Sequence, residues 1–139
     1  MGDLRARFSE LSRELGRHLG YPTSPDEDGA FAIEVPASGG RKQWVKLSLD
    51  SDRLGNPLIV MSSKCGSVEH IELKSALEIN GQMPYGALGI VGGGTMVLRA
   101  GCYVGQGAVS IPELVAMIKH VAAYADRVER GLYGDVDLF

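Results

Sequence analysis

Residues 87–100 read Ala-Leu-Gly-Ile-Val-Gly-Gly-Gly-Thr-Met-Val-Leu-Arg-Ala. Two short runs of strand-forming residues flank three glycines, which predicts a β-hairpin with strands at 87–91 and 95–100. A dinucleotide-binding loop is excluded, because its glycines must lead into a helix and these lead into a strand. The chain contains no Gly-Lys-Ser or Gly-Lys-Thr, so a P-loop is excluded as well.

Three further strands are predicted upstream of this hairpin. Apolar residues alternate with polar or small ones along two stretches, which is the period of a strand with one buried face. They are Phe31, Ile33 and Val35 in the first stretch and Val45, Leu47 and Leu49 in the second. The run Leu58-Ile59-Val60-Met61 follows a turn-rich segment and is apolar on both faces. Short strands joined by turns predict an antiparallel meander.

A helix over residues 3–19 is predicted at the start of the chain. Its apolar residues recur at steps of three and four and therefore lie on one face. They are Leu4, Phe8, Leu11, Leu15 and Leu19. Gly20 and Pro22 supply the stop signal, because glycine adopts the left-handed C′ conformation and proline cannot continue a helix.

Two more helices are predicted from their start and stop signals. Ser67 is a plausible N-cap for a helix that runs to about residue 80, with Gly81 as its stop. Ser110 and Glu113 have the spacing of a capping box and open a longer helix to about residue 130, closed by Gly131.

The predicted order is therefore α-β-β-β-α-β-β-α, which indicates the α+β class with an antiparallel sheet packed against helices. We expect residues 1–131 to form a single α+β domain and residues 132–139 to form a C-terminal tail. A chain of 139 residues has the usual length of one domain and can bury a core without disulfides.

Composition narrows the classes of partner. The 14 basic residues are outnumbered by 17 acidic residues, whereas a nucleic-acid-binding domain usually carries a basic face. The first twenty residues are charged throughout, and no stretch is apolar enough for a membrane span. The two cysteines cannot form a disulfide framework. We expect a cytoplasmic protein that binds neither nucleic acid nor membranes.

No catalytic or metal-binding motif is complete in the sequence. Cys65 lies near His70, but a zinc site needs about four ligands in paired spacings. A nucleophilic pair of Cys65 with His70, or of Cys102 with His120, needs only that the two side chains meet in space. We expect no metal, no cofactor and no enzymatic activity. A small ligand-binding protein or enzyme that uses one of the cysteines stays open as a third hypothesis.

Apolar residues exceed what a monomer needs to bury in three places. The last helix has an apolar stripe over nearly half its circumference, which fits either a wide core face or contact of its edge with another chain or with the first helix. The second helix is apolar on two sides, with Leu73 and Leu77 opposite Val68 and Ile79, which suggests a second copy, a shorter helix, or burial beneath the third helix. Trp44 shares a face with Lys46 and Ser48, where it forms either a local lid or a binding anchor.

Three segments resemble the type III secretion chaperone superfamily, which includes the YbjN-type domains. They are Leu77-Glu78-Ile79-Asn80, the run from Pro84 to Ile90, and Met96-Val97-Leu98-Arg99, followed by the helical stretch 111–129. The resemblance implies a small acidic homodimer that holds a partly unfolded segment of a client protein without chemistry. A YbjN-like adaptor or regulatory domain that binds a folded partner is the alternative.

The resemblance also assigns residues to two surfaces. The expected partner-binding residues are Phe8, Leu15, Trp44, Ile59 and Met61. The expected dimer-interface residues are Val68, Ile71, Ile79, Leu88 and Ile90.

Overall fold

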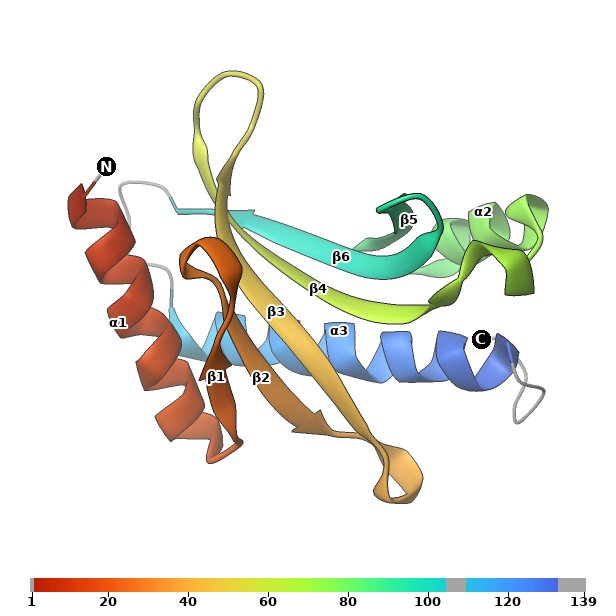
Figure 1. Cartoon of the computed structure of the whole chain (residues 1–139), viewed down its shortest axis with the longest axis horizontal. Coiled ribbons are helices and arrows are strands. Elements are labelled where there is room, and N and C mark those ends of the chain that lie inside the picture. Colours follow the sequence, from red (N-terminus) through yellow and green to blue (C-terminus); the bar gives the residue numbers. More distant parts are fainter. Residues whose placement is uncertain (1, 105–109, 133–139) are drawn as a thin grey trace.

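The computed structural model describes residues 2–104 and 110–132. Within these ranges the chain forms one six-stranded antiparallel sheet and three α-helices, which confirms the α+β class (Figure 1). The helices are α1 (Gly2–Leu19), α2 (Leu73–Gln82) and α3 (Ile111–Leu132). The strands are β1 (Thr23–Pro25), β2 (Phe31–Pro36), β3 (Lys42–Ser51), β4 (Pro57–Ser67), β5 (Ala87–Val91) and β6 (Thr95–Tyr103).

The strand order across the sheet is β1-β2-β3-β4-β6-β5, with every neighbouring pair antiparallel. The meander and the hairpin of the sequence are both present. They join through β4 and β6, so β5 lies at the edge. The short strand β1, which pairs with β2, was not predicted.

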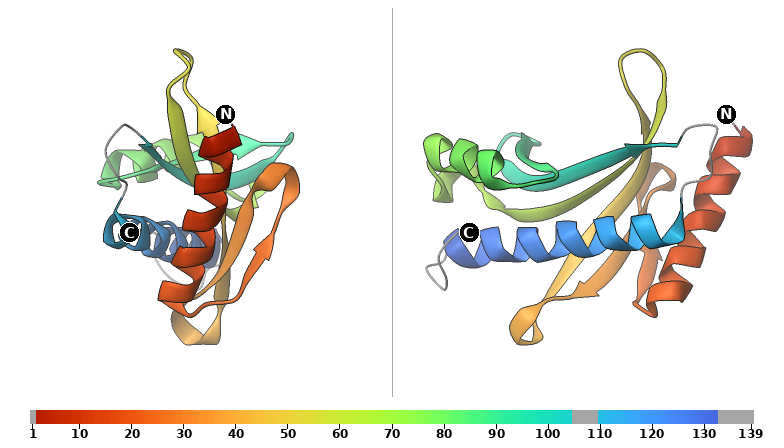
Figure 2. Two further views of the ribbon diagram at one scale, coloured as in Figure 1. Left: turned by 90° about the vertical axis from the view of Figure 1, so that its left-hand side faces the viewer. Right: turned by 180° about the vertical axis from the view of Figure 1, so that it is seen from behind.

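Two helices cover the same face of the sheet. Helix α3 packs across β3, β4 and β6, and α1 contacts α3 and β3 (Figure 2). Helix α2 lies beside β5 at the far end of the sheet. Helix α3 lies behind the sheet in the view of Figure 1, so this view looks onto the sheet face that neither α1 nor α3 covers.

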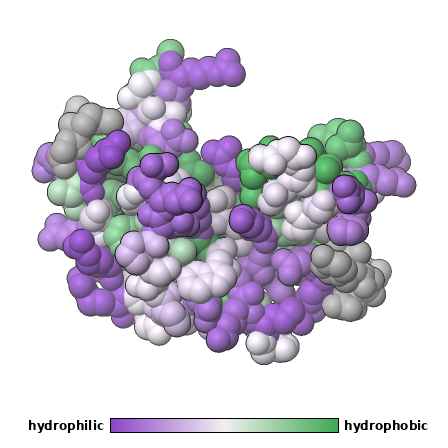
Figure 3. Space-filling view, viewed as in Figure 1, coloured by the Kyte–Doolittle hydropathy of each residue, from purple (hydrophilic) through white to green (hydrophobic). Residues whose placement is uncertain are grey.

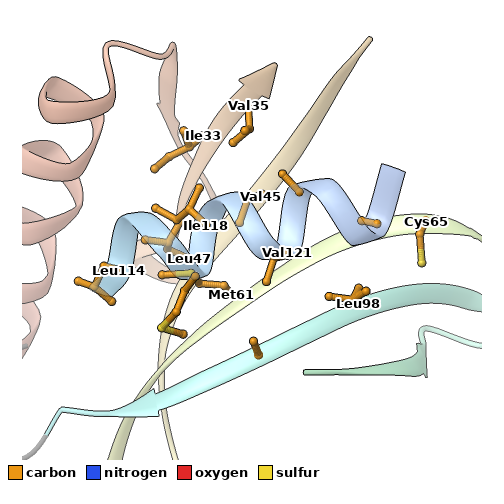
Figure 4. Packing of buried hydrophobic residues seen from close by; sticks show 14 of the residues in the cluster. Ile33, Val35, Val45, Leu47, Met61, Cys65, Leu98, Leu114, Ile118 and Val121 are labelled. Atoms are coloured by element: carbon orange, nitrogen blue, oxygen red, sulfur yellow. The ribbon is translucent and has the colours of Figure 1, made fainter. Parts of the chain in front are cut away.

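The core lies between α3 and the sheet, where side chains from both layers interdigitate (Figure 4). The wide apolar stripe of α3 is a core face, because its residues are buried within one copy of the chain. They are Leu114, Met117, Ile118, Val121, Ala122, Ala125 and Val128. The sequence-based alternative that this helix meets another chain is not needed to explain the stripe.

Helix boundaries follow some of the expected signals. Gly20 has a φ of 69° beyond the end of α1, as predicted for a C′ glycine. The Ser110 hydroxyl accepts a hydrogen bond from the backbone N–H of Glu113 at 3.2 Å, which confirms the N-cap of α3. Gly131 is not a stop, since α3 runs to Leu132, the first residue of the expected tail; residues 133–139 lie outside the described part.

The boundary between β4 and α2 was predicted wrongly. Strand β4 continues to Ser67, and α2 begins at Leu73 and runs past Gly81 to Gln82. The Ser67 hydroxyl does cap a helix, but it accepts from the N–H of Glu69 in a single 3-10 turn over Val68–His70. A capping residue indicates where a helical turn begins but does not indicate the length or type of the helix.

Candidate functional site

The uncovered sheet face is hollow and is lined by alternate residues of β3, β4 and β6. We call this surface the open face. Its central residues are Trp44, Lys46, Val60, Ser62, Lys64, Val97 and Arg99. The hollow has a volume of about 900 Å³ and extends to Ala32 and Ser24 on one side and to Val91 on the other. Figure 3 looks onto this face.

Trp44 is the one tryptophan of the chain and is 47% exposed at this hollow. Its position follows from strand alternation, because Gln43 and Val45 on either side point into the core. Across the open face it lies opposite Glu34 of β2 in the strand register. An indole half in water and half on a sheet combines apolar area with a polar N–H, as at protein-binding sites.

Two buried polar side chains fix the backbone beneath this face. The Ser63 hydroxyl donates to the carbonyl of Trp44 at 2.8 Å. The Gln43 amide donates to the carbonyl of Lys64 at 2.7 Å. Both bonds lie on the core side of the sheet. They connect β3 to β4 beyond the pair of Lys46 and Ser62, which is the last aligned pair at this end of the two strands. The tryptophan and the lysine on the other side are therefore presented by a rigid strand pair.

Cationic side chains surround the centre of the open face. Lys46 pairs with Ser62, which pairs in turn with Arg99, so the two cations stand on either side of one serine. Lys64 lies two residues from Ser62 on the same strand and opposite Val97. Within the described residues these three cations form no ion pair within 4 Å, whereas Lys42 at the margin meets Glu34 at 3.1 Å.

A β-bulge next to Lys64 bends the strand. Lys64 pairs with Val97 and Gly66 with Met96, so Cys65 is an extra residue in β4. Gly66 has a φ of 135°, which glycine adopts without steric cost. Cys65 lies on the core side of β4, as Met61 and Ser63 do, and burial raises the pKa of its thiol to about 12. A thiol that stays protonated at neutral pH is a poor nucleophile.

The second cysteine is a poor nucleophile for the same reason. Cys102 is half-buried, and burial followed by the charge of Glu113 raises the pKa of its thiol. His120 instead makes a 2.6 Å contact from Nε2 to the carbonyl of Tyr85, and its ring lies against Tyr124. In residues 2–104 and 110–132, no three His, Cys, Asp or Glu side chains gather as a metal site requires.

No protein-family model matches the chain, and no curated protein sequence matches it significantly. In the part of the chain that the structure describes, no helix has the length and apolar character needed to cross a membrane.

Four of the five expected partner-binding residues lie in the core. Phe8, Leu15, Ile59 and Met61 are buried, and only Trp44 is exposed. Ile59 and Met61 were assigned to the wrong face of β4. Ile59 pairs with Leu49 and Met61 with Leu47, so both lie on the core side of the sheet with those leucines. Of the apolar run 58–61, Val60 is the residue that lines the hollow. Four consecutive apolar residues carry no alternation from which the facing could be predicted.

The expected dimer-interface residues are also mostly inward. Ile79 and Leu88 are buried, and Val68 and Ile71 pack half-buried against the core. Ile90 alone is exposed. The late start of α2 places Val68 and Ile71 before the helix, and the buried side of α2 is the side that carries Ile79.

Apolar side chains nevertheless emerge at this end of the molecule. They are Leu73, Leu77 and Ile90, and we call them the α2–β5 patch. Leu73 and Leu77 are 64% and 70% exposed and stand one helical turn apart on α2. Figure 3 shows apolar surface gathered over the end where α2 and β5 lie. The sequence marked the two leucines as a second apolar side of the helix.

Proposed function

We propose that this protein is a non-catalytic binding module that holds an extended segment of another protein on its open face. The observation that carries the proposal is the exposed Trp44 at a 900 Å³ hollow, on strands fixed from beneath by Ser63 and Gln43. A tryptophan on a rigid base gives contact area at little entropic cost, which is how binding anchors work.

The shape of the hollow favours a polypeptide over a small substrate. It is a broad depression across several strands, from Ser24 beyond β2 to Val91 at β5. Small-molecule sites instead enclose most of the ligand. Val60 and Val97 line the hollow between the polar side chains but are only 8% and 5% exposed, so Trp44 is the exposed apolar residue at its centre.

A chaperone-like homodimer is part of this proposal. The α2–β5 patch offers large apolar side chains on a helix and on the adjacent sheet edge, and an isologous contact would cover the patch of each copy with that of the other. Two features support the resemblance to type III secretion chaperones. One is the order of the major elements, and the other is Asn80, whose side chain makes two hydrogen bonds to the backbone of Leu88. We place the protein in a reducing, cytoplasmic compartment, which suits its two free cysteines.

The test compares an unfolded protein with its folded form. Reduced, carboxymethylated α-lactalbumin is permanently unfolded, and native α-lactalbumin is the folded control. We expect calorimetry to detect binding of the unfolded form only. Trp44→Ala should weaken that binding by about tenfold or more, which is 1.4 kcal/mol or more.

Leu54→Ala is the matched control, because Leu54 is an exposed apolar residue on the β3–β4 hairpin outside the hollow. This variant should bind as the wild type does. Binding of the native form alone would support the adaptor alternative. Equal loss in both variants, or none in Trp44→Ala, would show that the open face is not the site.

A further inference from the structure

We infer that the segment held on the open face is acidic, with carboxylate side chains on either side of an apolar residue that meets Trp44. The inference rests on the proposed function and names the chemistry of the partner. It starts from Lys46, Lys64 and Arg99, exposed cations at the centre of the hollow.

The protein's own carboxylates do not neutralise these cations. Glu34 is the nearest acidic residue in the strand register, and it is engaged by Lys42 at 3.1 Å. Asp26 and Glu129 reach the rim of the hollow. Neither comes within 4 Å of a Lys or Arg nitrogen of the open face among the described residues. Positive charge is therefore concentrated here in a chain whose net charge is −3.

The spacing of the cations suits an extended peptide. Lys46 and Arg99 lie two strands apart, which is about 10 Å between backbones, and Lys64 lies about 7 Å along the strand from the row that joins them. An extended segment presents the side chains of one face about 7 Å apart. Acidic residues at alternate positions of such a segment can therefore reach two or all three cations, because Lys and Arg side chains are long.

The apolar part of the hollow favours a peptide over single-stranded nucleic acid, which is also an anion. Nucleic-acid grooves use several aromatic side chains to stack successive bases. Among the described residues that line the hollow, Trp44 is the one aromatic residue, which leaves no second ring for a neighbouring base, and the adjoining Val60 and Val97 are only 8% and 5% exposed. We therefore commit to the acidic polypeptide and make the nucleic acid an outcome of the test.

The first experiment needs no partner and no variant. Trp44 is the sole tryptophan, so fluorescence excited at its absorption reports on the open face alone. Iodide and caesium are quenchers of opposite charge. We expect iodide to quench Trp44 more strongly than caesium relative to free tryptophanamide, because the cations attract the anion. Equal quenching, or stronger quenching by caesium, would overturn the inference.

The second experiment titrates tryptophan-free peptides of about twelve residues, long enough to cross the sheet, and follows Trp44 emission. Glutamate, glutamine or lysine occupies alternate positions of otherwise identical peptides. We expect the glutamate peptide to bind about tenfold more tightly than the glutamine peptide. Lys46→Glu with Arg99→Glu should abolish that preference. Lys119→Glu with Arg53→Glu is the charge-matched control, on α3 behind the sheet and on the β3–β4 hairpin outside the hollow, and should retain most of the preference.

The outcomes separate the two proposals. Equal binding of the glutamate and glutamine peptides would overturn the acidic preference and leave the proposed function standing. Binding of none of the peptides would count against both. Tighter binding of an oligothymidine of similar length than of the glutamate peptide would replace the acidic polypeptide with single-stranded nucleic acid.

Discussion

The side-chain amide of Asn80 takes the place of a neighbouring strand at the outer edge of β5. Its oxygen accepts from the N–H of Leu88 at 2.7 Å, and its nitrogen donates to the carbonyl of the same residue at 3.3 Å. A single side chain thus satisfies both backbone groups of Leu88 and connects α2 to the sheet. This gives a physical reason for an asparagine at the position where the sequence resembles the secretion chaperones.

Replacing Asn80 should loosen this connection. We expect Asn80→Ala to lower the free energy of unfolding by about 1–3 kcal/mol, because two partly buried backbone groups lose their partner. Asn80→Asp keeps an acceptor for the N–H but repels the carbonyl, so it should fall between the alanine variant and the wild type. Urea unfolding measures both. Gln82→Ala, an exposed change on the same helix, is the control, and an equal loss there would contradict the role of Asn80.

Asp126 makes a second connection, between α3 and the turn before β3. Arg41 donates to its two carboxylate oxygens from Nε at 2.9 Å and from a terminal nitrogen at 3.0 Å, and Arg130 lies 3.3 Å away. The bonds from Arg41 are the main reason that the pKa of this buried carboxyl lies below its usual 3.8. A carboxyl with a lowered pKa stabilises the fold above its unfolded pKa and loses that effect as pH falls through its folded pKa.

We therefore expect Asp126→Asn to cost about 1–3 kcal/mol of unfolding free energy at neutral pH, because charged hydrogen bonds are replaced. The difference from the wild type should shrink as the pH falls below about 4, where the wild-type carboxyl also becomes protonated. Urea unfolding at neutral and at acidic pH measures this. A difference that is constant with pH would show that the carboxylate charge is not what matters.

Sequence reasoning placed Trp44 correctly because its neighbours alternate clearly between apolar and polar. The predicted facing was wrong for Ile59 and Met61. In a wholly apolar run, strand pairing decides which residues face the core, and a single sequence does not show how strands pair. Sequence reasoning identified Lys46 beside Trp44 but missed Lys64, because the expected strand stopped at residue 61. The open face as a charged site becomes visible only when β4 is known to reach the bulge at Gly66.

Helix α2 is the element whose sequence signals were most misleading. Ser67 is a genuine cap, yet the residues after it form one 3-10 turn and a bend before the α-helix starts at Leu73. The α-helix therefore starts five residues later than expected, with Glu72 instead of Ser67 at its N-cap position. Ile79 becomes a core residue, and Leu77 becomes an exposed one. The apolar surplus that the sequence indicated is present, but on other residues.

The exposed side of α2 makes a direct prediction about assembly. We expect light scattering to find a dimer for the wild type and a monomer for Leu77→Asp, with unchanged circular dichroism, because a charge cannot be buried without a partner. Leu54→Asp introduces the same charge on the β3–β4 hairpin and should stay dimeric. A wild type that is monomeric at high concentration would exclude the α2–β5 patch as a dimer contact.

The described residues form a two-layer structure. Helices α1 and α3 cover one face of the sheet, and no described helix covers the other face. The α3 stripe, wide as it is, is fully used by the core, so it does not indicate a partner. Among the described residues, large apolar side chains are exposed at the open face, at the α2–β5 patch, and at Leu54, Tyr85 and Tyr103. We assign a client segment to the open face and a second copy to the α2–β5 patch.

The most direct test of this assignment is an amide and indole NMR titration of the labelled protein with the glutamate peptide. The account predicts that the largest shifts fall on the Trp44 indole and on the open-face residues of β3, β4 and β6, while the exposed side of α3 stays unchanged. Shifts centred on α1 or on the α2–β5 patch, with an unperturbed Trp44 indole, would contradict it.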